Sequence, residues 1–182
     1  MTEEYIDILD NNTGEPTGER RSRAEVHKLG LWHRTVHIYV FRKFNNRLEL
    51  LVHLRSKNKN LKPDKWDTRI AGHLKAGENW IEAVSGELYD EIGLKINPAD
   101  LIDGNIRKRT DGMNNEFTRS YFYRFDGETD NLKFNDGEVA QIKWLAETEI
   151  KKELVDNKEK WCCSLISFEL MSTMLKDKLH HG

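Results

Sequence analysis

Apolar positions recur along the chain with the spacings of helices and strands. The clearest helix begins after Asn79 and ends before Gly93. Its apolar positions are Ile81, Val84, Leu88 and Ile92, which lie three or four residues apart and therefore share one face. Asn79 is a favourable N-cap, Glu82 completes a capping box, and Gly93 suits a left-handed C-terminal cap.

Alternating apolar residues and runs of β-forming residues predict the strands. In the body of the chain we expect strands at 35–42, 47–55, 105–110, 116–125 and 139–145. The first two are separated by Asn45 and Asn46, which are typical of a tight turn, so they are predicted to form a hairpin.

Residues 1–34 look like an extension that precedes the main sheet. A strand is expected at 5–9, a turn at 10–14 and a weak returning strand at 16–19. Ser22 is placed to cap a short helix that ends before Gly30. The extension is thus predicted to be a β-hairpin followed by a helix.

The C-terminal part is expected to be helical, at 147–154 and at 161–175, with 157–182 as the C-terminal helix region. Its apolar stripe consists of Trp161, Leu165, Phe168 and Leu175. Cys162 and Cys163 fall on this predicted helix and are assigned a packing role. Strands and helices alternate irregularly, which favours an α/β fold in which a mixed sheet is covered by helices on both faces, within a single domain of residues 1–182.

Composition and charge narrow the class of protein. The chain has 182 residues and a formal net charge of −2, so no general nucleic-acid or membrane surface is expected. It contains no long apolar run, and its acidic N-terminus does not resemble a signal peptide. Two adjacent cysteines suit neither a disulfide nor a zinc site, which favours a reducing, cytoplasmic location.

Three acids on the predicted helix are the first candidates for chemistry. Glu87, Asp90 and Glu91 lie at i, i+3 and i+4 and share a face, where like charges repel by roughly 0.2–0.5 kcal/mol per pair. Clustered carboxylates are typical ligands of Mg²⁺ or Mn²⁺. The alternative is an ordinary solvated acidic face, which is common on helices.

The stretch 72–94 resembles the Nudix box, whose pattern is Gly, five residues, Glu, seven residues, Arg-Glu, an aliphatic residue, any residue, Glu-Glu, any residue, Gly and an aliphatic residue. The matching residues are Gly72, Glu78, Glu87, Leu88, Glu91, Gly93 and Leu94. Asp90 replaces a Glu and keeps its charge, whereas Gly86 replaces the Arg that helps to orient the acids in the family.

The resemblance implies a Nudix-type α/β/α sandwich and a metal-dependent hydrolase that cleaves a small-molecule diphosphate. It implies that Glu87, Asp90 and Glu91 hold Mg²⁺ or Mn²⁺, with the backbone carbonyl of Gly72 as a further ligand. Glu87 and Glu91 are the positions most often bound directly.

The general base in this family is often an acid on a later loop, and Glu138 is our candidate; the alternative is a turn acid after Gly137. Glu78 is expected to support the loop. A basic loop at 56–65 is predicted either to meet substrate phosphates or to be simply solvated. Its lysines are Lys57, Lys59, Lys62 and Lys65, and the candidate substrate-binding residues are Arg55, Lys57 and Lys62.

The N-terminal half, together with the pair Gly72-His73, resembles the Nudix branch of type 1 isopentenyl-diphosphate isomerase. In that branch, histidines near His27, His33 and His73 help to bind a metal. Ala71 stands where the isomerase has its catalytic cysteine, and Asn114 stands near an acidic ligand position that precedes Glu116. The alternative for His33 and His37 is packing or hydrogen bonding at the sheet edge.

Three functions follow. The first is hydrolysis of a diphosphate that links a nucleoside diphosphate to another group. The second is a catalytically weak nucleotide-binding module, which Gly86 keeps open, and the third is an isomerase, which Ala71 disfavours. Trp32, Trp66 and Tyr121 are candidates for stacking on a base, with a core position as the alternative for each. A homodimer through the extension or residues 121–125 is also an open prediction.

Overall fold

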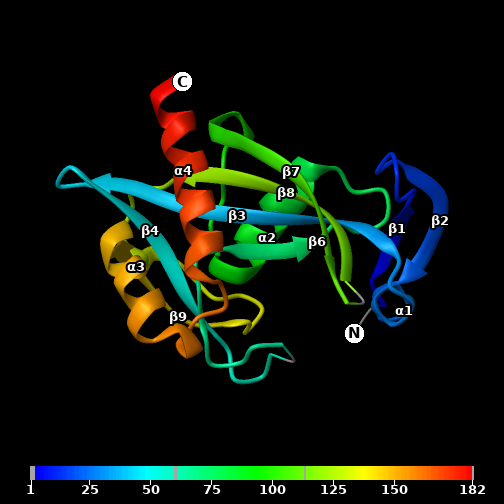
Figure 1. Ribbon diagram of the computed structural model, residues 1–182, viewed down its shortest axis with the longest axis horizontal. Helices are drawn as coiled ribbons and strands as arrows, with labels where there is room; N and C mark the ends of the chain where they lie inside the picture. Colours follow the sequence, from blue (N-terminus) through cyan, green and yellow to red (C-terminus); the bar gives the residue numbers. More distant parts are fainter. Residues whose placement is uncertain (1–2, 60, 113, 182) are drawn as a thin grey trace.

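A seven-stranded mixed sheet forms the centre of the computed structural model, which describes residues 3–59, 61–112 and 114–181. The strands are β3 (Trp32–Phe44), β4 (Arg47–Arg55), β5 (Trp66–Asp67), β6 (Ile70–His73), β7 (Leu101–Asp111), β8 (Asn114–Arg124) and β9 (Val139–Ala146). The strand order is β5-β4-β3-β8-β7, with β6 paired to β3 and β9 paired to β4 (Figure 1). β3 and β8 run parallel and the other pairs are antiparallel, so the predicted mixed sheet is confirmed.

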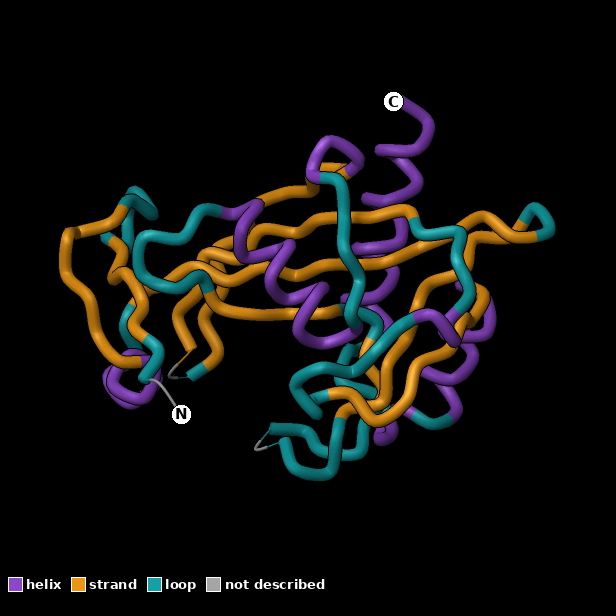
Figure 2. Tube along the Cα trace, turned by 180° about the vertical axis from the view of Figure 1, so that it is seen from behind, coloured by secondary structure: helices purple, strands orange, loops and turns teal. Residues whose placement is uncertain are grey.

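Helices cover both faces of the sheet. Helix α2 (Trp80–Ile92) packs on one face, and α3 (Glu147–Asp156) and α4 (Leu165–His181) pack on the other; Figure 2 shows the α2 side. Because neighbouring residues of a strand point to opposite faces, β3 serves both cores. Val36 and Ile38 join the α2 cluster, whereas Phe41 joins the cluster of α3 and α4. The expected α/β/α sandwich is therefore confirmed.

Both ends of α2 are fixed as the sequence predicts. The Asn79 side chain accepts hydrogen bonds from the backbone N–H groups of Ile81 and Glu82, and Glu82 accepts one from the backbone N–H of Asn79 at 2.9 Å. Gly93 closes the helix with φ of 69°, a conformation that glycine adopts without steric cost. The acids of α2 therefore stand on a firmly bounded helix.

The N-terminal extension is a hairpin and a helix, as expected. β1 (Tyr5–Leu9) pairs antiparallel with β2 (Pro16–Ser22), and Ser22 caps α1 (Arg23–Leu29) through a complete capping box. Two hydrogen bonds join β1 to the loop before α2: Ala76 N–H donates to the Tyr5 carbonyl at 2.8 Å, and Gly77 N–H donates to Asp7 at 2.7 Å. The extension is thereby held beside the acidic helix.

Three strands begin earlier than their sequence pattern indicates. β3 starts at Trp32, β7 at Leu101 and β8 at Asn114. Residues 32–41 of β3 pair continuously with residues 115–124 of β8. The paired segments include polar residues whose sequence alone does not predict a strand. Tertiary pairing therefore overrides local propensity here.

The start of the C-terminal helix was predicted wrongly. Trp161 forms a bridge with Trp66, and the backbone N–H of Cys162 donates to the Trp66 carbonyl at 2.8 Å. Because this backbone pairs with a strand, it cannot be helical, and α4 starts only at Leu165. The two cysteines therefore precede the helix, although Trp161 still packs in the core of α3 and α4.

Among the helices that the structure describes, none is both long enough and apolar enough to cross a membrane.

Candidate metal and phosphate site

Glu87 and Glu91 stand one turn apart on α2 and are withdrawn from solvent. Glu91 is only 4% exposed, and burial, followed by the charge of Glu87, raises its pKa to about 8. Burial also raises the pKa of Glu87 to about 7. Two neighbouring carboxyl groups that are largely removed from water resist ionisation unless a positive charge joins them. This donor set of hard oxygens suits a divalent cation such as Mg²⁺ or Mn²⁺.

The backbone of β6 lies directly against Glu87. A Cβ atom built on Gly72 would stand 1.8 Å from Glu87 Oε1, so no other residue fits position 72 without moving the carboxylate. The structure thus brings Gly72 and Glu87, which are fifteen residues apart in sequence, into immediate contact.

Two further acids act on this site: Asp90 of α2, which belongs to the box pattern, and Glu4 of the extension, which does not. Asp90 is exposed, and its backbone carbonyl accepts hydrogen bonds from Asn135 and Asp136 on the loop before β9, both at 3.2 Å. After burial, the largest contribution to the raised pKa of Glu87 comes from the negative charge of Glu4, ahead of that of Asp90. Glu4 belongs to the extension, and no local pattern marked it as part of this site.

The Glu78 side chain supports the loop before α2. It accepts a hydrogen bond from the backbone N–H of Lys75 at 2.8 Å. Its place is therefore the structural one that was expected. On α2, position 86 leaves open space where the family has an arginine.

Lys59 connects the basic loop with the acids. Its ammonium group forms an ion pair with Glu138, and it is the cation that most lowers the pKa of Glu91. The backbone N–H of Ser56 donates to the Glu138 carbonyl at 2.8 Å, which holds the two loops together. Glu138 thus lies beside a lysine, and both residues line a pocket that is also lined by Glu4 and Arg23 of the extension.

A cleft of about 290 Å³ opens beside Gly72 and carries an excess of positive charge. Its cationic residues are Arg23, Arg55, Lys59, Lys62, Arg69 and Arg109, against the acids Asp67, Asp111 and Glu116. Of the predicted substrate-binding residues, Arg55 and Lys62 line this cleft, whereas Lys57 is exposed and is not among its lining residues. Such a surface is suited to attract a polyanion.

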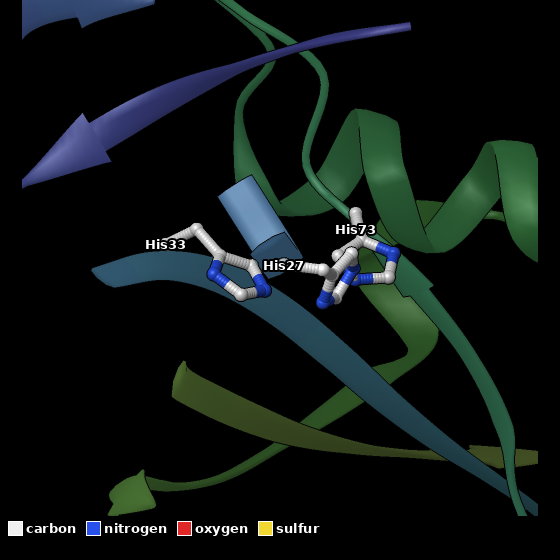
Figure 3. A group of neighbouring side chains, drawn as sticks. All are labelled: His27, His33 and His73. Carbon is white, nitrogen blue, oxygen red and sulfur yellow. Dashed lines mark hydrogen bonds between the residues drawn. The ribbon is translucent and has the colours of Figure 1, made fainter. Parts of the chain in front are cut away.

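Three histidines from three elements lie close together (Figure 3), and one of them, His73, also lines the cleft. His27 comes from α1, His33 from β3 and His73 from β6, and their ring nitrogens lie within 4.8 Å of one another. His27 Nε2 lies 3.1 Å from His73 Nε2, and His27 Nδ1 lies 2.8 Å from the Asn114 side-chain oxygen. The arrangement is compact enough for a shared cation.

His33 is fully buried and has a free nitrogen. Its Nδ1–H donates to the Leu31 carbonyl at 2.8 Å, which leaves Nε2 without a hydrogen-bond partner among the described residues. Burial lowers the pKa of His33 and brings the pKa of His73 well below its ordinary value. Neutral rings are the form in which histidine ligates a metal. The Leu31 contact equally satisfies the packing alternative.

Position 71 offers no acid, base or nucleophile, because Ala71 lines the cleft there. Sequence order gave no sign that Cys162 also reaches the cleft, where its carbonyl accepts a hydrogen bond from Lys62 at 2.8 Å. Burial raises the pKa of the Cys162 thiol to about 12, so it is protonated at neutral pH.

The three candidate stacking residues belong to the body of the fold. Trp32 packs against Phe117, Trp66 packs against Trp161, and Tyr121 is buried in the α2 core. None of the three is among the residues that line the cleft.

Comparison with known proteins gives consistent matches. The family model described as NUDIX domain matches residues 31–165. An uncharacterized Nudix hydrolase of Clostridium acetobutylicum is 33% identical over 162 residues, which is 87% of this chain and 77% of that protein. Nudix hydrolase 3 of Arabidopsis thaliana is 39% identical over 103 residues, 57% of this chain but only 13% of that much longer protein.

More distant matches agree with these. The isopentenyl-diphosphate Delta-isomerase of Pectobacterium atrosepticum is 26% identical over 157 residues, or 85% of this chain and 83% of that protein. Among solved structures, DR0079 from Deinococcus radiodurans superposes with a TM-score of 0.65 at 19% identity, covering 85% of this chain and 90% of that one. The structural likeness concerns the fold alone.

Proposed function

The chain belongs to the NUDIX domain family, and from this premise we propose that it is a divalent-metal-dependent hydrolase that cleaves the diphosphate bond between a nucleoside diphosphate and another group. Nudix hydrolases act on diphosphates and generally use divalent metal ions. The observation that carries the proposal is the carboxylate pair of buried Glu91 and half-buried Glu87, of which Glu87 contacts Gly72 at the edge of a basic cleft.

In this proposal Glu87 and Glu91 hold Mg²⁺ or Mn²⁺, with the Gly72 carbonyl and Asp90 as further ligands. The bound cation supplies neutralisation of the phosphate oxygens and a lower pKa for a bound water. Around it, Arg55 and Lys62 bind the diphosphate and orient it. Positive side chains fixed in advance stabilise charge that develops on the phosphate oxygens without any reorganisation during the reaction.

Glu138 is proposed as the general base that takes a proton from the attacking water. Its ion pair with Lys59 favours the ionised carboxylate, which is the form that a base requires. A substrate phosphate that competes for Lys59 frees Glu138 to approach the water. The proton thus moves to a carboxylate oxygen of Glu138.

The histidine group is proposed as a separate cation site. The support is the buried Nε2 of His33, which lacks a partner among the described residues, and the lowered pKa values of His33 and His73, which keep these two rings neutral. Calorimetric titration with Mn²⁺ tests it: two ions per chain are expected in the wild-type protein and one in His33→Gln. A stoichiometry of one in both proteins contradicts this second site.

Isomerisation of isopentenyl diphosphate is the alternative raised by the isomerase-like relatives, and the three-histidine group favours it. It requires groups that add a proton to carbon and remove one, yet Ala71 provides neither, and the Cys162 thiol has a pKa near 12. The cationic lining of the cleft is also poorly matched to a hydrocarbon chain.

The deciding experiment measures product formation from nucleotide sugars, ADP-ribose, dinucleoside polyphosphates and nucleoside di- and triphosphates, with Mg²⁺ and with EDTA. Metal-dependent cleavage that is lost in Glu91→Gln is the expected result. Tight binding of a nucleotide without turnover indicates a binding module instead. Conversion of isopentenyl diphosphate to its isomer, with no cleavage of the panel, indicates an isomerase.

A further inference from the structure

The face of the sheet beneath α4 is unusually polar near β7. Strand register places His37 of β3 beside Ala71 of β6 and Ser120 of β8. In the same way, Arg107 of β7 is paired with Thr118 of β8. A sheet face that is covered by a helix is normally apolar, because burying polar groups without partners costs free energy.

These residues enclose a cavity of about 130 Å³ between the sheet and α4. Its lining consists of His37, Tyr39, Arg107, Arg109, Thr118 and Ser120 from the sheet, Arg69 from the loop between β5 and β6, and Ser167, Met171 and Met174 from α4. It shares His37, Arg69 and Arg109 with the lining of the cleft beside Gly72, so the two spaces adjoin. Among the described residues that line the cavity there is no carboxylate.

The arginines of the cavity are only partly neutralised. Arg69 lies 3.6 Å from Asp67 and Arg109 lies 3.2 Å from Glu116, and both acids line the cleft rather than the cavity. Arg107 lines the cavity but is exposed to solvent, and it forms no ion pair with any residue that the structure describes. The cavity therefore has three guanidinium groups and only hydroxyl, imidazole and thioether partners within it.

The same excess of positive charge acts on the pKa of His37. Removal from water lowers its pKa well below the ordinary value, and the nearby charges of Arg69, Arg109 and Arg107 lower it further. The imidazole is therefore neutral at physiological pH and does not add a fourth charge. A neutral ring remains able to donate one hydrogen bond to an anion.

We propose that this cavity is an anion-binding subsite, and that the group joined to the scissile diphosphate carries its own negative charge, a carboxylate or a phosphate, which Arg107, Arg109 and Arg69 bind. Guanidinium groups match both anions in a two-pronged geometry. That the bound group is joined to a diphosphate that is cleaved rests on the proposed hydrolase function, whereas anion binding in the cavity can be measured without turnover.

The first test is NMR of the arginine Nε–H groups, with sodium acetate and inorganic phosphate as probes and sodium chloride at equal ionic strength as the reference. Saturable shifts of the Arg69, Arg107 and Arg109 signals are expected, stronger for the anion type that the cavity prefers. Shifts no larger than those in chloride, or shifts confined to Arg55 in the cleft, overturn the proposal.

The second test compares UDP-glucuronate with UDP-glucose, which differ by one carboxylate. Calorimetric dissociation constants are expected to favour UDP-glucuronate by at least about tenfold, and Arg107→Gln is expected to remove that preference without weakening UDP-glucose. Lys108→Gln is the matched control, because Lys108 is the next residue of β7 and lies over the Trp32 ring at 4.5 Å. It removes the same charge and should preserve the preference.

The outcomes separate this inference from the hydrolase proposal. Preferential binding of UDP-glucuronate without cleavage of any substrate supports the subsite and argues against the hydrolase. Cleavage of both compounds with equal affinity, unchanged by Arg107→Gln, overturns the subsite and leaves the hydrolase intact. If phosphate but not acetate shifts the arginine signals, NADPH and NADH replace the pair, since they differ by one phosphate.

Discussion

The carboxylate of Glu87 occupies the space beside the Cα atom of Gly72, where a Cβ atom would lie 1.8 Å from Oε1. This contact joins strand β6 to the acidic helix α2 at the point where the two candidate metal-binding elements meet. Position 72 therefore requires glycine for space, since no positive backbone angle is involved there.

Two alanine substitutions on the same motif should have opposite effects. Gly72→Ala forces the Glu87 carboxylate away and should cost about 1–3 kcal/mol of stability together with most of the activity. Gly86→Ala adds the same methyl group in a helix where nothing lies within 4 Å, so it should stabilise the protein by about 1 kcal/mol. Urea unfolding of both variants checks this, and equal effects would refute the contact.

Glu91→Gln should separate activity from stability. Glu91 is only 4% exposed and has a pKa of about 8, so without metal it is mostly protonated at neutral pH, and Gln replaces one neutral side chain by another of the same shape; the metal-free variant should therefore unfold at the same temperature as the wild-type protein or higher. Turnover should fall by about 100-fold or more, because the cation loses a charged ligand. The assay is initial rate at saturating Mg²⁺, and a rate within a factor of two of wild type would exclude Glu91 as a ligand.

Raising the pH should lower the stability of the metal-free protein and increase the stabilisation that Mg²⁺ provides. Glu87 and Glu91 have pKa values of about 7 and 8 in the folded protein, against an ordinary value of 4.5. Between pH 4.5 and 8 the native state therefore holds more protons than the unfolded state, and this contribution makes stability fall as the pH rises. Mg²⁺ binds the ionised acids, so its stabilising effect should grow over the same range.

Thermal unfolding with EDTA and with excess Mg²⁺, at several pH values, measures both trends. Glu91→Gln provides the control, because it should flatten the pH dependence in EDTA and reduce the gain from Mg²⁺. A gain from Mg²⁺ that is independent of pH would indicate that the cation binds elsewhere.

Glu138→Gln should slow turnover by about 10²–10⁴-fold if Glu138 is the base, while Mg²⁺ affinity measured by calorimetry stays unchanged. Asp130→Asn removes an exposed acid from the preceding loop and should leave the rate as it is. A large loss of Mg²⁺ affinity in Glu138→Gln would instead make this residue a ligand.

The sequence predicted those parts of the molecule that local rules determine. Asn79, Glu82 and Gly93 bound α2 as their capping preferences require, and the turn at Asn45 and Asn46 has positive φ angles of 48° and 61°, as a tight hairpin demands. Contacts between distant segments were beyond reach. The bridge between Trp66 and Trp161 moved the start of α4, because one tertiary pairing replaced a plausible helical turn.

In the candidate site, too, local sequence patterns predicted some residues, whereas others are brought in by contacts between distant segments. The spacing of Glu87 and Glu91 placed them on one helical face, but it gave no sign of Glu4, whose charge acts on Glu87 from the extension. Likewise, Arg69 and Arg107 carry no motif, and they line one cavity only because the loop before β6 and strand β7 both reach the sheet face beneath α4. Whether such residues come together depends on strand register and on the crossover connections between strands, and neither can be predicted from a local sequence pattern.

The most direct test of the central claim is an anomalous-scattering map from a crystal of the protein grown with Mn²⁺. The account predicts a peak bonded to carboxylate oxygens of both Glu87 and Glu91, and near the Gly72 carbonyl. A map in which Mn²⁺ binds only the three histidines, or in which both acids are metal-free in a fully loaded crystal, would contradict it.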